Sequence, residues 1–202
     1  TAISGDMLEA RSQTSIQDVA SQAPSVTLRQ NSAAFGPSLG ASIRGVGQLD
    51  FNPALEPGVG MYVDDVYYAS LTGSILDLLD LERVEILRGP QGTLAGKNSI
   101  GGAVKLYSKK PGGDGGYVSA TYGSRSRLDL RASADFEISE NLFARVSGVS
   151  KEQRGHVQIR DYGCDFPASG VPALRTVGTD CVVGHGGEVN YSAARGQLRW
   201  IA

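Results

Sequence analysis

A glycine-rich segment that ends in a lysine, Gly89 to Lys97, has the residue types of a phosphate-binding loop. Such a loop cradles phosphates with backbone N–H groups. It needs a glycine five residues before the glycine that precedes the lysine, and a hydroxyl residue after the lysine. This sequence has Gln91 and Asn98 at those two positions. We therefore do not expect nucleotide binding at this segment.

No other group of side chains has the composition and spacing of a catalytic site. Asp64 and Asp65 are adjacent, and on a strand adjacent side chains point to opposite faces, so their carboxylates would not converge as an acid–base pair. His156 and His185 fall in or beside a long loop, where a histidine is usually solvated. We expect neither an enzyme nor a bound cofactor.

Two cysteines, Cys164 and Cys181, enclose a segment that is rich in glycine and proline. This composition favours a disulfide that closes a loop and forms in an oxidising compartment. Metal binding with the flanking His156 and His185 is one alternative, although the 16 intervening residues do not match zinc-ligand spacing. Free thiols are the other alternative. We expect a disulfide and no metal site.

Composition excludes several classes of protein. The 202 residues carry 19 Lys and Arg against 21 Asp and Glu, and this balance gives no reason to expect a nucleic-acid partner. A hydrophobic content of 41% is enough for a core. No apolar run is long enough for a membrane-spanning helix. The chain starts at Thr1 without a leader, so we expect that a signal peptide was removed or that upstream sequence is missing.

The elements that would position these residues change character at the glycine-rich stretch Pro111 to Gly116. Before it, Ser15 to Asp18 fits a capping box and starts an apolar pattern at helical spacing that Pro24 ends. Ser74 to Asp77 repeats that signature. Short strand-like runs, separated by turn residues, are expected at 25–28, 42–44, 60–63, 83–87 and 103–107.

After this stretch, apolar and polar residues alternate strictly. From Arg127 to Ile138 every even position is apolar and every odd one is polar or charged. Such a strand is about 40 Å long at about 3.3 Å per residue, which is long for a soluble sheet and sufficient to cross a bilayer at a tilt. Further strands are expected at 117–122, from Leu142, and near the C-terminal end. A soluble antiparallel sheet with one wet face fits the alternation equally well.

The predicted connections favour the membrane interpretation. They are 123–126, 139–141 and about 154–188, so two short turns are followed by one long loop. Short turns on one side and long loops on the other are typical of outer-membrane barrels.

The segment from Val84 to Val104, VEILRGPQGTLAGKNSIGGAV, resembles the plug-domain signature of TonB-dependent receptors. Ser42 to Val46 is similar to the upstream motif of that family. Tyr62 to Val66 is similar to its central hairpin, in which Asp-Gly usually stands where this chain has Asp64-Asp65. Lys109 to Pro111 is similar to the usual end of the plug. Ala95 departs from the family, which commonly has an aromatic residue there.

The resemblance implies an α+β plug domain, a small mixed sheet with short helices, over residues 1–112. Antiparallel strands of an incomplete transmembrane β-barrel would follow over residues 113–202. A plugged barrel of this kind has about 22 strands, so we expect this chain to be a fragment. The TonB box of the family is expected to precede Thr1.

The resemblance also implies a function. It implies TonB-driven import of a scarce nutrient across the bacterial outer membrane, with a ferric siderophore as the default ligand. The partners would be TonB, this extracellular ligand and outer-membrane lipid. Cobalamin, a saccharide or an aromatic compound are alternative cargoes, and a passive pore or a surface adhesin is the non-transporting alternative.

Three sets of site residues follow from the resemblance. Arg44 and Arg88 match the motif arginines that pair with barrel carboxylates in the family, so we expect them to lock the plug. We expect a structural role for the residues that let the backbone turn tightly in the motif, namely Gly89, Pro90, Gly92, Gly96, Gly101 and Gly102. We expect ligand contacts from the loops after the motif strands, namely from Gln30, Asn31, Phe35, Gln48, Asp50, Phe51, Asn52, Tyr68, Ser70 and Thr72.

Overall fold

A computed structural model describes residues 1–202 with the exception of 32–37, 49–54, 70–79, 114, 176–179 and 202. The chain divides into two compact units, Thr1–Lys110 and Pro111–Ala202. The glycine-rich stretch expected to separate two domains begins at this division. Within the described residues, no helix combines the length and the apolar character needed to cross a bilayer.

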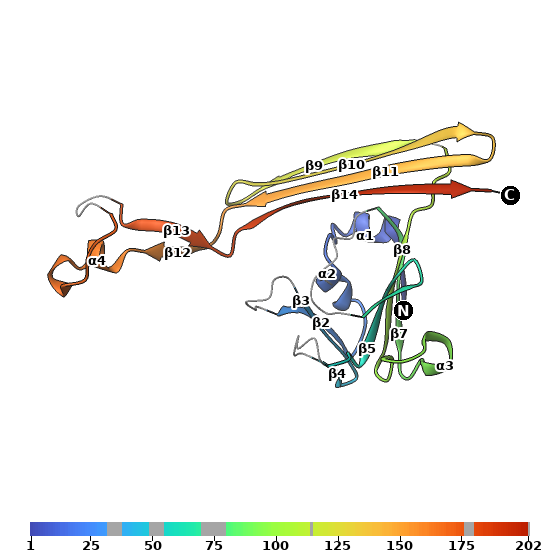
Figure 1. Ribbon diagram of the computed structural model, residues 1–202, viewed down its shortest axis with the longest axis horizontal. Helices are drawn as coiled ribbons and strands as arrows, with labels where there is room; N and C mark the ends of the chain where they lie inside the picture. The colour runs from blue at the N-terminus through green and yellow to red at the C-terminus, as the bar shows by residue number, and fades with distance from the viewer. Residues whose placement is uncertain (32–37, 49–54, 70–79, 114, 176–179, 202) are drawn as a thin grey trace. The chain divides into compact units, whose positions relative to one another are not determined.

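The first unit is built on a five-stranded sheet in the order β1-β7-β8-β5-β6 (Figure 1). The β5–β8 pair is parallel and the other neighbours are antiparallel. The strand bounds are Ala2–Ser4 for β1, Leu81–Arg88 for β7, Gly102–Ser108 for β8, Val59–Val63 for β5 and Val66–Tyr68 for β6. The strand-like runs in the sequence predicted the centres of β5, β7 and β8 but not β1 and β6, which are only three residues long.

A second sheet of the same unit has the order β2-β3-β4 and is antiparallel throughout. Its strands are Val26–Asn31, Ser38–Ile43 and Val46–Gln48. Apolar residues from both sheets and two helices form one core, in which Ile16, Leu39, Val59 and Val84 are fully buried. This unit therefore hides its apolar side chains, as a water-exposed domain does.

Short helices cover parts of these sheets. α1 (Gly5–Ala10) lies beside β1 and β7, and α2 (Ile16–Ala20) lies beside β2. The predicted capping box is present, since the Ser15 side chain accepts from the Asp18 N–H and the Asp18 carboxylate accepts from the Ser15 N–H. The second predicted box, Ser74 to Asp77, lies outside the described residues. α3 (Gly92–Ala95) is a single turn between β7 and β8.

The second unit contains a four-stranded antiparallel sheet in the order β14-β11-β10-β9. The bounds are Gly116–Gly123 for β9, Arg127–Ser139 for β10, Leu142–Gln153 for β11 and Val189–Trp200 for β14. These agree with the predicted strands to within a few residues at most ends. The agreement is good because an uninterrupted period of two specifies both a strand and the face on which each side chain lies.

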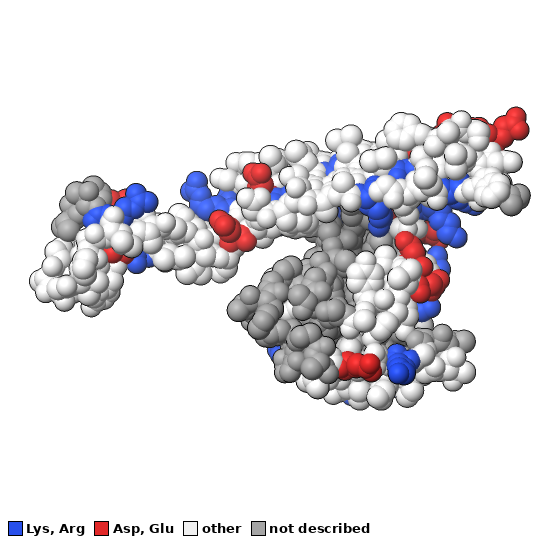
Figure 2. Space-filling model, viewed as in Figure 1, with Lys and Arg blue, Asp and Glu red and all other residues white. Residues whose placement is uncertain are grey.

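The exposure of the two faces of this sheet is the reverse of that in a water-soluble sheet, because the apolar face is exposed and the polar face is buried. Apolar side chains on the even positions are exposed, with Val118 at 84% and Trp200 at 75%, whereas Arg145 and Ser147 on the odd positions are 2% and 1% exposed. Lys and Arg side chains of the sheet gather toward one side of it in Figure 2, and the opposite side is mostly uncharged. A wet polar face with an apolar core face would show the opposite exposure.

The polar face is held by contacts across neighbouring strands. Asp135 and Arg145 are direct partners in the β10–β11 register, and the Arg145 guanidinium donates to the Asp135 carboxylate at 2.8 Å. The hydroxyls of Ser133 and Ser147 lie 3.1 Å apart one layer further along. Direct cross-strand partners of this kind fix the register of the sheet.

The long connection between β11 and β14 has a structure of its own, which the sequence pattern did not predict. It contains the hairpin β12 (Val157–Arg160) and β13 (Val182–Gly186), the helical turn α4 (Tyr162–Asp165) and a 3-10 turn at Pro167–Ser169. We call residues 154–188 the arm. Cys164 and Cys181 form a disulfide inside it, with their Cα atoms 5.7 Å apart.

Candidate functional site

The two motif arginines meet at one place in the first unit. Arg44 stands at the turn between β3 and β4, where its N–H donates to the Ser25 carbonyl at 2.8 Å. Arg88 ends β7, and its Nη1 donates to the Pro24 carbonyl at 3.4 Å. An ideal Cβ on Gly89, the neighbour of Arg88, would lie 3.9 Å from Nη1 of Arg44. The Arg44 guanidinium thus lies beside Gly89, the neighbour of Arg88, although the two arginines are far apart in sequence.

This arginine pair, Arg44 and Arg88, is exposed and bears two like charges. In the described part of the chain, neither arginine takes part in an ion pair. Neighbouring guanidinium groups repel each other and favour a carboxylate or another anion as a partner. Both guanidinium groups are therefore accessible to an anionic partner that lies outside the described residues.

The glycines of the motif have different reasons to be glycine. A Cβ on Gly102 would lie 2.1 Å from the Leu87 carbonyl oxygen, and one on Gly101 would lie 2.7 Å from the Val46 carbonyl oxygen. These two positions therefore allow β8 to start close against β7 and β4. Gly89 and Gly96 have positive φ, at 96° and 71°.

For Gly92 and Pro90 the structure shows neither a close backbone approach nor a positive φ that would require the residue found there. A Cβ on Gly92 would meet nothing within 4 Å, and its φ is not positive. Pro90 is exposed, and together with Gly92, Gly96 and Lys97 it lines a shallow depression. The side chain of Ala95 lies outside the described set.

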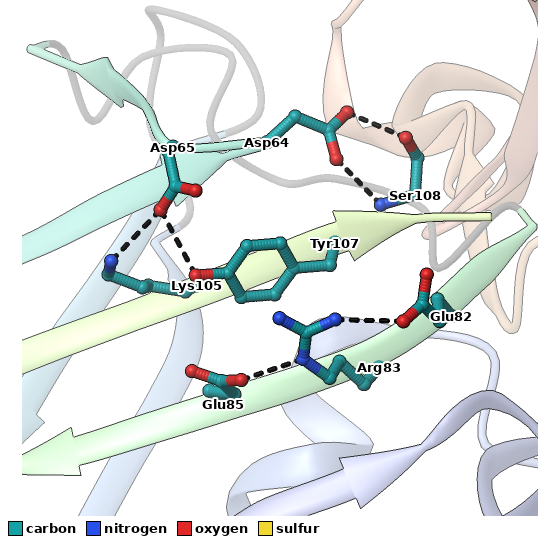
Figure 3. A network of polar contacts seen from close by, with 8 residues as sticks. All are labelled: Asp64, Asp65, Glu82, Arg83, Glu85, Lys105, Tyr107 and Ser108. Carbon is teal, nitrogen blue, oxygen red and sulfur yellow. Dashed lines mark hydrogen bonds and ion pairs between the residues drawn. The ribbon is translucent and has the colours of Figure 1, made fainter. Parts of the chain in front are cut away.

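A polar network links the strands β7 and β8 of the five-stranded sheet to the β5–β6 turn (Figure 3). We call it the ladder; it comprises Asp64, Asp65, Glu82, Arg83, Glu85, Lys105, Tyr107 and Ser108. The Arg83 guanidinium bonds to Glu85 at 2.7 Å and to Glu82 at 2.9 Å, and it lies 3.8 Å from the centre of the Tyr107 ring. Asp65 accepts from Lys105 Nζ at 2.9 Å and from the Tyr107 hydroxyl at 3.0 Å.

The charges of the ladder support one another. The hydrogen bond from Lys105 lowers the pKa of the Asp65 carboxyl, and the Tyr107 hydroxyl adds to this effect. The same hydrogen bond raises the pKa of Lys105. Burial raises the pKa of Tyr107, and the hydrogen bond to Asp65 raises it further. Each group thus keeps the protonation state that its neighbour requires at neutral pH.

The ladder corrects one expectation. Asp64 and Asp65 do not lie on a strand; they are the two central residues of the β5–β6 turn, with φ of 49° and 64°. Asp64 accepts from the N–H and the hydroxyl of Ser108, at 2.8 and 2.7 Å, while Asp65 turns to Lys105. The carboxylates do diverge, but the turn is the reason. The departure from Asp-Gly to Asp-Asp is the one sequence signal that could have pointed to the ladder.

The residues expected to contact ligand fall into three groups. Gln30, Asn31 and Gln48 lie at strand ends rather than in loops, because β2 and β4 extend to Asn31 and Gln48. The antiparallel register places these ends on one side of the β2-β3-β4 sheet, away from the Arg44 turn. Tyr68 ends β6 in the other sheet and is 40% exposed. Outside the described residues lie Phe35, Asp50, Phe51, Asn52, Ser70 and Thr72.

The described residues contain no cluster of side chains suited to metal binding. No group of three or more His, Cys, Asp or Glu side chains there could hold a metal ion. The two cysteines are consumed by the disulfide.

A family model named TonB-dependent Receptor Plug Domain matches residues 1–103 of the chain. This match includes both motif arginines, the β5–β6 turn and every glycine of the motif from Gly89 to Gly102.

The chain belongs to the TonB-dependent receptors.

Curated relatives point to the same family of bacterial outer-membrane transport receptors. The pesticin receptor of Yersinia pestis is 36% identical over 104 residues, which cover 50% of this chain and 15% of the relative. The ferrioxamine B receptor of Salmonella typhimurium is 28% identical over 159 residues, which cover 74% of this chain and 21% of the relative. This TonB-dependent receptor chain therefore spans about a fifth of the curated relatives or less.

Solved structures agree with this fold. The ferric yersiniabactin uptake receptor FyuA from Yersinia pestis superposes with a TM-score of 0.68 at 27% identity, over 78% of this chain and 24% of that chain. The ferripyoverdine receptor of the outer membrane of Pseudomonas aeruginosa has a TM-score of 0.63 at 20% identity, over 78% of this chain and 20% of that chain, and shows likeness of fold alone.

Membership of the family gives the reversed sheet a physical meaning. In a receptor barrel the apolar face of each strand meets lipid and the polar face meets the lumen. The apolar residues of β10 from Leu128 to Ile138 span about 25 Å along the barrel axis, at about 3.3 Å per residue and a tilt of about 40°, which matches the height of an outer-membrane apolar band.

Proposed function

We propose that the receptor to which this chain belongs imports a ferric siderophore across the bacterial outer membrane, driven by TonB. In this proposal residues 1–112 are the plug domain and residues 113–202 are the first strands of the barrel. The observation that carries it is the family match over the plug motifs, which fold into a polar-surfaced unit with the arginine pair exposed. A plug is required by an energised transporter and is superfluous in a passive pore.

The names of the relatives favour iron as the cargo. Ferric yersiniabactin, ferrioxamine B and ferripyoverdine appear in the descriptions of proteins similar to this one. The ligand would bind at the extracellular side, with Gln30, Asn31 and Gln48 as plug contacts, because they share one end of a sheet and combine amide donors and acceptors. The chain contributes no catalytic step to this function.

Uptake of iron-59 siderophores by iron-starved cells with and without TonB tests this function. We expect uptake of at least one ferric siderophore that requires both the complete receptor and TonB. TonB-dependent growth on another nutrient, without an iron phenotype, would replace the cargo and keep the mechanism. Uptake that is indifferent to TonB would overturn the proposal in favour of a passive pore or an adhesin.

The arginine pair is proposed to lock the plug to carboxylates of the barrel. Replacing Arg44 or Arg88 by Ala should then loosen the plug, since each loses a charge-assisted hydrogen bond worth roughly 1.5–3 kcal/mol. Sensitivity of cells to a large antibiotic, such as vancomycin, reports that loosening.

Arg29→Ala is the matched control, because Arg29 is an exposed arginine on β2 outside the motifs. Equal antibiotic sensitivity of the Arg29, Arg44 and Arg88 variants would argue against a lock.

A further inference from the structure

The β5–β6 turn of this chain has an unusual composition. Val63 pairs with Val66, so Asp64 and Asp65 form a two-residue hairpin turn in which both residues have positive φ. Turns of this type strongly prefer glycine at the second central position, because an L side chain is strained in the left-handed region. Asp65 occupies that position with φ of 64°. Contacts outside the turn can offset this strain at Asp65.

The side chain of Asp65 supplies that stabilisation by reaching β8. Its carboxylate accepts from Lys105 Nζ at 2.9 Å and from the Tyr107 hydroxyl at 3.0 Å. Figure 3 shows the Lys105 ammonium and the Tyr107 hydroxyl converging on one carboxylate oxygen. Asp64 adds two bonds to Ser108 on the same strand, and its own N–H donates to the Leu106 carbonyl at 2.9 Å.

These hydrogen bonds connect the β5–β6 turn to neighbouring strands at one end of the sheet. β5 and β8 are the parallel pair of the sheet, and the turn follows directly on the C-terminal end of β5. Parallel pairing is slightly weaker per residue than antiparallel pairing. The Arg83 guanidinium of β7 stacks on the Tyr107 ring, so the contacts of the turn extend through Tyr107 to β7. The turn is thus fastened to two further strands at one end of the sheet.

We propose that Asp65, Lys105 and Tyr107 form a charge latch that holds the β5–β6 hairpin in a strained turn against β8. Breaking the latch releases the hairpin as a local unit while the apolar core below it stays folded. Asp65 is 63% exposed and Lys105 is 21% exposed, so water and salt can compete for the latch. The inference concerns the mechanics of the first unit and does not depend on which ligand the receptor carries.

Hydrogen–deuterium exchange of the complete receptor in detergent micelles tests the latch, with peptides covering residues 59–69 as the readout. Asp65→Ala keeps the backbone strain and removes the carboxylate, so exchange of the hairpin amides should accelerate roughly threefold to tenfold. Asp65→Gly removes both the strain and the latch, so its exchange rate should stay near that of the unmodified receptor. Peptides covering α2 should be unchanged in both variants.

Lys105→Met provides the second arm of the experiment. In the unmodified receptor it should accelerate hairpin exchange to about the same extent as Asp65→Ala, and 1 M NaCl should act in the same direction. Both effects should vanish in the Asp65→Gly background. Equal acceleration by Lys105→Met in the two backgrounds, or no acceleration by Asp65→Ala, would overturn the latch. An Asp65→Gly variant as fast as Asp65→Ala would overturn the strained turn.

Discussion

The two units of this chain distribute polar and apolar residues in opposite ways. In Thr1–Lys110 most of the buried side chains are apolar, and Ile16, Val59 and Val104 are fully buried. In the sheet of the second unit the least exposed side chains include Arg145 and Ser147, while Leu198 is 73% exposed. The first unit is organised for water around it, and the sheet is organised for hydrocarbon on its outer face.

The comparison teaches that solvent, rather than residue type, decides which contacts stabilise each unit. In the first unit the burial of apolar surface is the main source of stability. In the sheet the apolar face leaves water for lipid rather than for a packed protein core, and the polar face must be stabilised by pairing of its charged groups. Substitutions should therefore have different consequences in the two units.

The largest effect is expected from Asp135→Ala. Asp135 and Arg145 are 4% and 2% exposed, and removing one partner of a buried ion pair costs about 3–5 kcal/mol. The midpoint of guanidinium unfolding of the complete receptor in lipid vesicles should fall accordingly. Asp165→Ala, which breaks the partly exposed pair with Arg160 in the arm, is the control and should lower the midpoint far less, because water and salt screen an exposed pair. If Asp135→Ala and Asp165→Ala lowered the unfolding midpoint equally, pairing of the buried charges would not be what stabilises the polar face of the sheet.

A charge on the lipid face should come next. Leu130→Arg places a guanidinium on the apolar face of β10, and such a charge costs about 2–4 kcal/mol at the middle of a bilayer and less toward its edges. The receptor should insert less efficiently into vesicles and unfold at a lower guanidinium concentration. Leu130→Met keeps the face apolar and should be neutral. If the Arg variant inserted as well as the Met variant, this face would not be a lipid face.

The disulfide should have a comparable but local effect. Replacing Cys164 and Cys181 by Ser removes a cross-link between two residues 17 positions apart, worth roughly 3 kcal/mol by chain entropy. The Asp161 carboxylate holds the same loop, since it accepts from the Leu174 and Arg175 N–H groups at 2.6 and 2.7 Å.

Limited proteolysis should accordingly cut the arm of the Ser variant much faster, while the strands β9, β10, β11 and β14 stay protected. Cleavage that spreads into those strands would show that the arm supports the sheet, contrary to this prediction.

The smallest effect is expected from pH. The Lys105 hydrogen bond lowers the pKa of Asp65 below its ordinary value of about 3.9, so the stabilisation is complete above that value and is lost as pH falls through the lower folded-state pKa. Hairpin exchange, corrected for its intrinsic rate, should be flat from about pH 5 to 8 and should accelerate below about pH 4. The Asp65→Gly variant should lack the acid acceleration that the unmodified receptor shows.

Prediction from the sequence succeeded where the pattern was periodic and local. The alternation from Arg127 to Ile138 predicted β10, and the Ser15 capping box predicted α2. It failed where structure depends on distant partners. β1 is three residues long, and only its pairing with β7 makes it a strand. The disulfide of the arm was predicted correctly, but its hairpin was not. The arm is also held by Asp161, whose partners are backbone groups and therefore leave no mark in the sequence.

The candidate site was predictable to a similar degree. Resemblance identified Arg44 and Arg88, but the turn at Pro24 and Ser25 that brings them together emerged only from the tertiary structure. The ladder remained unrecognised because Glu85, Lys105 and Tyr107 are ordinary strand residues in one dimension. They become a network only when the register of β7 and β8 aligns them, with Glu85 opposite Lys105.

The pairing of β1 with β7 has a consequence for biogenesis. Ala2 lies opposite Glu85, so β1 leaves the ribosome long before the strand that it pairs with has been synthesised. Contacts of such sequence separation form late, because a long loop must be closed before they are gained. β1 should therefore stay accessible to proteases and chaperones longer than any other strand of its sheet, and its protection would mark the completion of folding of this unit.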